Sequence, residues 1–122
     1  MSDLERRKAV AEAIRDRIFT GLQPCIRGIT NFKIEASHDE SSQCADLCIC
    51  DPGNHRNYVA FQVWYHSTVW MSVNIPNWLL GKIEFPKVKS QKDGGYTDFE
   101  LTGVKEETIV ALLAAVVAEY AK

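Results

Sequence analysis

The N-terminal part of the chain carries apolar side chains at helical spacing. The positions on this stripe are four residues apart: Val10, Ile14, Ile18 and Leu22. Such a period predicts an amphipathic helix over residues 3–22. Ser2 followed by Glu5 has the spacing of a capping box at a helix start. Gly21 and Pro24 predict the end of this helix.

Between residues 31 and 101 the period of the apolar side chains shortens to that of β-strands. Six segments show the alternation: 32–36, 44–50, 59–66, 69–75, 82–85 and 96–101. The links are short and rich in turn residues, as in Pro52-Gly53-Asn54, so we expect antiparallel neighbours in a meander. Residues 76–80 predict one helical turn, and the polar stretch 87–95 predicts a loop.

Residues 105–120 form the second predicted helix, with a broad apolar face from Ile109 to Tyr120. An antiparallel sheet with one apolar face needs a cover, and two helices supply it. We therefore predict an α+β fold of two layers, in which an antiparallel sheet of about six strands carries both terminal helices on one face. The length of 122 residues and the lack of a repeat or linker predict one domain, 1–122.

The sheet face opposite the helices is the first candidate for function. If the aliphatic positions face the helices, the alternate positions lie on the other face: Cys44, Asp46, Cys48, Cys50, Gln62, Trp64, His66, Trp70, Ser72 and Asn74. Tryptophans beside amide and hydroxyl groups are typical of a recognition surface. The alternative is a satellite core, with the tryptophans under the 76–80 turn or the 87–95 loop. As partner-binding residues we predict Gln62, Trp64, His66, Trp70, Ser72 and Asn74, with Trp78 at the edge.

Charge and composition bear on whether the chain is disordered, binds nucleic acid, crosses a membrane or is secreted. Apolar residues make up 46% of the chain and the formal charge is −2, which excludes a disordered chain and gives no overall attraction to nucleic acid. No apolar run reaches the roughly 18 residues of a membrane span. The start, "MSDLERRKAV", has no apolar h-region, so we predict no secretory signal, a cytoplasmic protein and free thiols.

The stretch "QCADLCICDPGNHRN" has the residue types of a zinc site but not the spacing. On an extended strand Cys44 and Cys50 lie roughly 20 Å apart, at about 3.3 Å per residue, so one ion cannot bind both. Only a bulge would bring Cys48, Cys50 and His55 together. We therefore predict neither a metal site nor a cofactor, and interpret the cysteines as small apolar side chains.

Two other chemistries remain as alternatives. A thiol-dependent enzyme or small-ligand binder would use Cys48 with His66 and Asp46, which share the predicted face. A nucleic-acid interface would use Lys87, Lys89 and Lys92 together with the basic side chains of the first helix, which are Arg6, Arg7, Lys8, Arg15 and Arg17.

The second half of the chain resembles the MmcQ/YjbR-like small domains. The matching stretches are "VWMSVNIPNWLLGK", "FPKVK" and "GGYTDFELTGVKEETIVALLAAVVAEY". The resemblance implies a double-wing α+β fold and the DNA binding proposed for that family. Residues 92–96 replace the Asn-Lys-x-x-Trp pattern of those domains, so the resemblance assigns no role to any residue.

From these features we expect a small non-catalytic protein-binding domain that uses the tryptophan-bearing sheet face. An inhibitor, an immunity or anti-defence protein, or an adaptor is of this kind. The first alternative is a nucleic-acid-associated domain, and the second is the thiol enzyme or ligand binder. The partner is expected to be another protein, and a homodimer would form through an exposed edge strand, 32–36 or 83–85.

Overall fold

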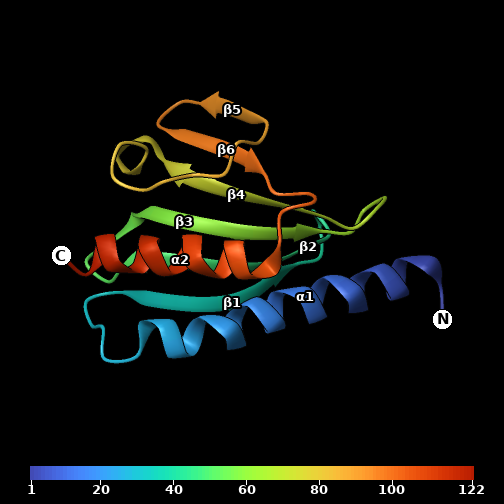
Figure 1. The fold of residues 1–122 in the computed structure, drawn as a ribbon. Coiled ribbons are helices and arrows are strands. Elements are labelled where there is room, and N and C mark those ends of the chain that lie inside the picture. The colour runs from blue at the N-terminus through green and yellow to red at the C-terminus, as the bar shows by residue number, and fades with distance from the viewer.

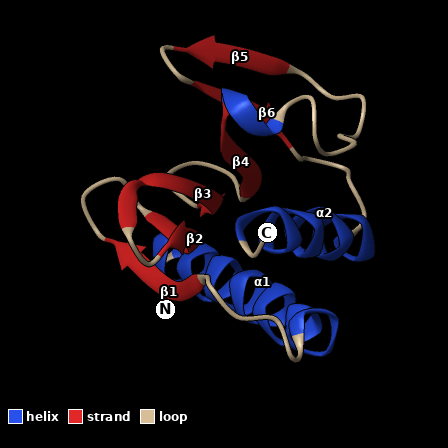
Figure 2. Cartoon of the chain, turned by 90° about the vertical axis from the view of Figure 1, so that its left-hand side faces the viewer, coloured by secondary structure: helices blue, strands red, loops and turns tan.

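The computed structural model describes the backbone of residues 1–122 and the side chains of residues 1–53 and 58–122. The protein has an α+β fold of two layers (Figure 1). A six-stranded antiparallel sheet forms one layer, and the N- and C-terminal helices form the other. Both helices lie on the same side of the sheet, as Figure 2 also shows. The predicted fold class is confirmed.

Helix α1 (Asp3–Ile26) begins at the predicted cap but ends later than predicted. The Ser2 hydroxyl accepts a hydrogen bond from the Glu5 backbone N–H at 3.1 Å. The predicted end at Gly21 and Pro24 is wrong, because the helix continues through both residues. Pro24 lies in the last turn, two residues before the helix ends. Its missing N–H therefore costs the helix one hydrogen bond near its end, where the loss disturbs few further turns.

The signal that ends α1 is Gly28. Its φ of +82° is the left-handed conformation that follows many helices and that glycine adopts without strain. Ile26, only 6% exposed, holds the last turn against the core, which explains why the helix runs past its proline. At the other end α1 extends beyond the strands (Figure 1), and Val10 is 49% exposed although the periodicity placed it on the buried stripe.

The strands are β1 (Lys33–Asp39), β2 (Cys44–Asp51), β3 (Asn54–Trp64), β4 (Trp70–Pro76), β5 (Ser90–Asp93) and β6 (Tyr96–Glu100). Their order in the sheet is β1-β2-β3-β4-β6-β5. The predicted meander therefore holds only as far as β4. The next neighbour of β4 is β6, and β5 forms the far edge.

The segment between β4 and β5 differs most from the prediction. The helical turn is present as η1 (Asn77–Leu79), but residues 82–85 form no strand. Ile83 is buried, and the Phe85 ring stacks on Phe99 of β6 with centroids 4.7 Å apart. The loop thus packs these apolar side chains against the core without forming a strand. Alternation alone does not distinguish such a loop from a strand.

Strand β5 lies within the stretch that was predicted to be a loop. Its four residues are all polar and exposed, so they show no alternation. A glycine pair connects it to β6, and Gly94 has a φ of +61°, the conformation that tight hairpins require. The register of the hairpin places Gln91 opposite Asp98.

Helix α2 (Glu106–Tyr120) and α1 cover the core face of the sheet. The residues with no exposure include Leu22, Leu47, Phe61, Val73 and Leu113. They come from both helices and from strands β2, β3 and β4, so one core joins the two layers. Among the described residues, no helix is both long and apolar enough to cross a membrane.

Strand β1 is an edge strand, so residues 33–36 of the predicted dimer edge do lie at an edge, whereas 83–85 do not. One backbone carbonyl of this edge already has a partner, because the Arg15 guanidinium of α1 donates to the Ser37 carbonyl at 2.9 Å. Lys33 and Glu35 form an ion pair beside it, at 2.7 Å. Charged side chains and an occupied carbonyl are features that limit pairing with a second strand.

Candidate functional site: the outer face of the sheet

We call the sheet face opposite the helices the outer face. The strand register places Trp64 directly opposite Trp70, Gln62 opposite Ser72, and Ala60 opposite Asn74. Cross-strand partners point to the same side of a sheet, and the residues between them, such as Phe61 and Val73, are buried in the core. The predicted assignment of faces on β3 and β4 therefore agrees with the structure.

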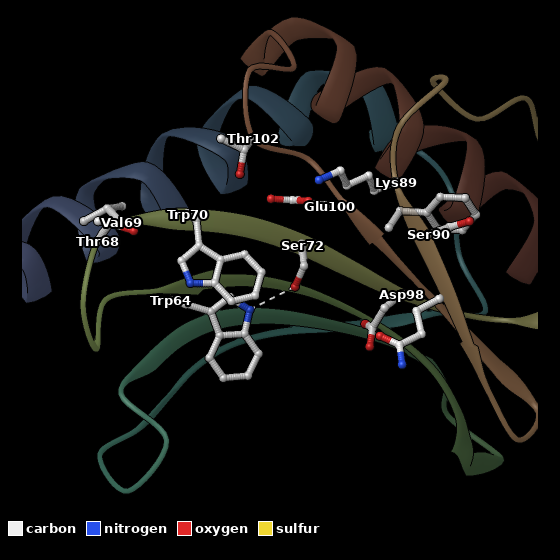
Figure 3. Close-up of a pocket in the computed structure, with 12 residues that line it drawn as sticks. Trp64, Thr68, Val69, Trp70, Ser72, Lys89, Ser90, Asp98, Glu100 and Thr102 are labelled. Carbon is white, nitrogen blue, oxygen red and sulfur yellow. Dashed lines mark hydrogen bonds between the residues drawn. The ribbon is translucent and has the colours of Figure 1, made fainter.

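Trp64 and Trp70 form a stacked pair at the centre of this face (Figure 3). Their ring centroids lie 5.5 Å apart and the planes differ by 16°. Both side chains are half-buried. The Trp64 indole N–H donates to the Ser72 hydroxyl at 2.9 Å, and this hydroxyl donates to the Gln62 side-chain oxygen at 3.2 Å. The chain of hydrogen bonds holds the rings in one orientation.

His66 completes the aromatic cluster. Its ring stands edge-on to both indoles, with centroids 6.3 Å from each. Helix α1 supports this end of β3, because Arg7 donates to the backbone carbonyl of Tyr65 at 2.9 Å and to that of His66 at 3.4 Å. Arg7 thus holds the segment after β3 that carries His66, next to the tryptophan pair.

A groove of about 830 Å³ lies beside the tryptophan pair. Trp64, Trp70 and Ser72 line one part of it, and β6 contributes Asp98 and Glu100. The start of β5 and the residue before it contribute three more lining residues, namely Lys89, Ser90 and Gln91. Figure 3 shows the charged side chains of Lys89, Asp98 and Glu100 on the β6 side of the groove, across from the indoles.

The tryptophan pair is therefore neither fully open nor under the 76–80 turn. Trp78 of that turn lies elsewhere. Its ring stands edge-on to the Tyr120 ring of α2, with centroids 5.7 Å apart, and the Lys82 ammonium lies 5.7 Å from the centre of the indole ring. Trp78 is 42% exposed but belongs to the helix side of the molecule. The structure does not bring it to the outer face, because η1 turns the chain toward α2.

Sequence reasoning missed the acidic side of the groove. Alternation in residues 96–101 does place Asp98 and Glu100 on one face, but the predicted order put another strand between β4 and β6. In the structure Ser72 lies opposite Glu100, and Asn74 lies opposite Asp98. The Asn74 amide also donates to the Asp98 carboxylate at 3.0 Å. Only the strand order shows that these carboxylates lie beside the tryptophans.

The cysteines of β2 are small, largely buried side chains of the outer face. All four cysteines of the chain are free thiols, and Cys25 alone is exposed. Burial raises the pKa of the Cys44 thiol to about 12 and that of Cys48 to about 11. Burial also raises the pKa of Cys50. Since a thiolate is the reactive form, these three thiols are poor nucleophiles at neutral pH.

We expect iodoacetamide at pH 8 to modify Cys25 much faster than any cysteine of β2, by at least roughly tenfold. The reason is that the raised pKa keeps the thiols of Cys44 and Cys48 protonated far above this pH, while Cys25 is exposed. Peptide mass spectrometry of the folded protein measures the four rates. Equal rates in the folded protein and in urea would contradict the buried placement.

The structure separates the residues of the thiol-enzyme alternative. Cys48 lies opposite Ala60, whereas Cys44 lies opposite Trp64, two residues before His66. Four residues along a strand span about 13 Å. Asp46 instead accepts a hydrogen bond from the Ser37 hydroxyl. Cys48 and His66 are therefore not placed for proton transfer between them.

The metal alternative required a bulge, and β2 does show a register irregularity at Cys50 and Asp51. The His55 side chain, its proposed ligand, lies outside the described residues. In the described part of the chain, no group of three or more His, Cys, Asp or Glu side chains is arranged to hold a metal ion.

Lys87 is exposed in the loop before β5, and the other basic residues of the nucleic-acid alternative do not share one surface. Lys89 lies beside Glu100, and its backbone carbonyl accepts a hydrogen bond from that residue. Lys92 pairs with Thr97, whose side chain is buried on the other face of β6. On α1, Lys8 contacts Glu40 at 2.8 Å. The arginines of α1 contact backbone carbonyls or carboxylates: Arg6, Arg7, Arg15 and Arg17.

Ser72→Ala tests whether the hydrogen bonds of the outer face orient Trp64. We expect the free energy of unfolding to fall by about 1 kcal/mol, because the half-buried indole N–H loses its acceptor. Urea denaturation followed by circular dichroism measures the change. Ser90→Ala is the control, with an expected effect under about 0.5 kcal/mol at an exposed position. An equal effect of the two substitutions would show that the Ser72 contact does not stabilise the fold.

Comparison of the chain with protein-family models, curated proteins and solved structures gave no match. The resemblance to the MmcQ/YjbR-like domains stays a prediction.

Proposed function

We propose that this chain is a small protein-binding domain without catalytic activity, whose outer face around Trp64 and Trp70 engages another protein. The observation that carries the proposal is the stacked, half-buried tryptophan pair beside a groove. Tryptophans held in one orientation lose little entropy on binding and supply large contact area, which is why they dominate many interfaces.

Inhibitors, immunity or anti-defence proteins and adaptors are proteins of this kind. We place the domain in the cytoplasm, because four free thiols fit a reducing compartment. The protonated thiols of β2 and the separation of Cys48 from His66 support a binding role over thiol chemistry. The dispersed lysines of the groove side support a protein over a nucleic acid as the partner.

A peptide-display selection on the immobilised folded protein tests the proposal while leaving the identity of the partner open. We expect the selection to enrich peptides that bind the immobilised wild-type protein and do not bind the immobilised Trp70→Ala variant. Selection that enriches no peptide, or only peptides that bind Trp70→Ala equally well, would overturn the proposal. A duplex DNA probe at low and moderate salt serves as the second arm, and specific, Lys89-dependent DNA binding would favour the nucleic-acid alternative.

A further inference from the structure

Carboxylates predominate on the outer face of the sheet. By the strand register, the outer face carries six carboxylates: Glu35, Asp39, Asp46, Asp93, Asp98 and Glu100. The cationic side chains that the structure describes on this face are two, Lys33 and Lys89. The chain as a whole has a formal charge of only −2. The outer face is therefore more acidic than the composition indicates.

The helix layer does not carry a comparable excess of one sign. Helix α1 contains five basic side chains, Arg6, Arg7, Lys8, Arg15 and Arg17, and four acidic ones, Asp3, Glu5, Glu12 and Asp16. Helix α1 packs on the core face of β1, β2 and β3, opposite the outer face. A partner that approaches the outer face thus meets mainly carboxylates, whereas one that approaches α1 meets charges that nearly balance. An acidic face of this kind attracts cationic partners and repels anionic ones.

The groove itself combines carboxylates with aromatic rings. Asp98 and Glu100 line it together with Trp64 and Trp70, and Lys89 is the one cationic side chain among the described residues that line it. The Asp98 carboxylate accepts from Asn74, which leaves lone pairs for a further donor. The face of an indole ring attracts cations, arginine most often, and nearby carboxylates strengthen that preference.

We propose that the groove binds a basic segment of the partner protein, with an arginine or lysine side chain over the tryptophan pair and its charge toward Asp98 and Glu100. The inference rests on the proposed function and adds the chemistry of the partner. A segment of a protein is favoured over a small cation because the groove of about 830 Å³ combines two indole rings with the two carboxylates. A small cation would meet the carboxylates and leave most of the groove unfilled.

A labelled oligoarginine peptide is the probe, and an oligoglutamate peptide of equal length is its counterpart. We expect fluorescence anisotropy at low salt to show binding of oligoarginine only. At moderate salt, the double variant Asp98→Asn/Glu100→Gln should weaken it roughly three- to tenfold, as expected for two partly exposed charge contacts. Lys89→Gln should strengthen it about twofold, because it removes the cation of the groove.

Glu35→Gln/Asp93→Asn is the matched control, since it removes two carboxylates of the outer face that do not line the groove. We expect a change under about twofold at moderate salt. An equal loss in both double variants would overturn the inference, because binding would then follow net charge alone. Equal binding of oligoarginine and oligoglutamate would also overturn it. Competition by spermidine at the concentration of the peptide would overturn it in favour of a small-cation site.

The two proposals fail in different ways. Peptides that are selected on the wild-type protein, depend on Trp70 and are neutral or acidic would leave the protein-binding function standing and overturn the basic partner. Selection without any Trp70-dependent peptide would overturn the function itself, whatever the charge of the peptides.

Discussion

Trp70→Ala is expected to weaken the binding of peptides selected on the wild-type protein by at least roughly thirty-fold, the equivalent of about 2 kcal/mol. The substitution removes one ring of the stacked pair and exposes the face of Trp64 that the Trp70 ring covers. It also removes a wall of the groove. Contact area and orientation are lost together, and central aromatic residues of interfaces typically show effects of this size. Titration calorimetry or anisotropy with a selected peptide measures the loss.

Trp78→Ala is the matched control for this prediction. It removes the same type of side chain, 42% exposed, from the helix side of the molecule, where the ring contacts Tyr120. We expect it to change the affinity less than about twofold. Trp70→Phe keeps an aromatic ring against Trp64 and should retain most of the binding. A Trp78 effect as large as the Trp70 effect, with both variants folded by circular dichroism, would move the binding surface away from the outer face.

The second large effect is on stability. Phe61→Ala should lower the free energy of unfolding by about 3–5 kcal/mol. Phe61 is fully buried on the central strand β3, where Leu47 lies opposite on one side and Val73 on the other, and neither is exposed. Strands on both sides restrain the backbone, so the cavity cannot collapse fully, and the cost includes lost contacts as well as lost burial. Urea denaturation followed by far-ultraviolet circular dichroism measures it.

Leu4→Ala provides the comparison at the overhanging end of α1. Leu4 is 38% exposed, so its substitution should cost less than about 1 kcal/mol. If Phe61→Ala costs no more than Leu4→Ala, then Phe61 is not a residue of the core and the register of β3 is incorrect. If Phe61→Ala is too unstable to purify, Phe61→Leu should still show a loss of about 1 kcal/mol or more.

The fold class followed from the sequence because hydrophobic period is a local property. The four-residue stripe and the cap at Ser2 predicted the start of α1, and the alternation predicted β1, β2, β4 and β6 within a few residues. Strand β3 was predicted to begin at residue 59 but begins earlier, at Asn54. Where the local sequence pattern predicted the wrong structure, burial of apolar side chains in the core outweighed the local preference. Ile26 buries the last turn of α1 in spite of Pro24, and Ile83 and Phe85 pack against the core from a loop.

The sequence by itself determined which face of each strand carries the tryptophans, because side chains alternate strictly along a strand. It also determined that the cysteines of β2 cannot share one ion, because an extended chain holds Cys44 and Cys50 apart. Only the tertiary structure decided that β6 lies beside β4, since the order of strands depends on long-range pairing that no local period encodes. That order places Asp98 and Glu100 beside Trp64 and Trp70 and makes an aromatic surface an acidic groove.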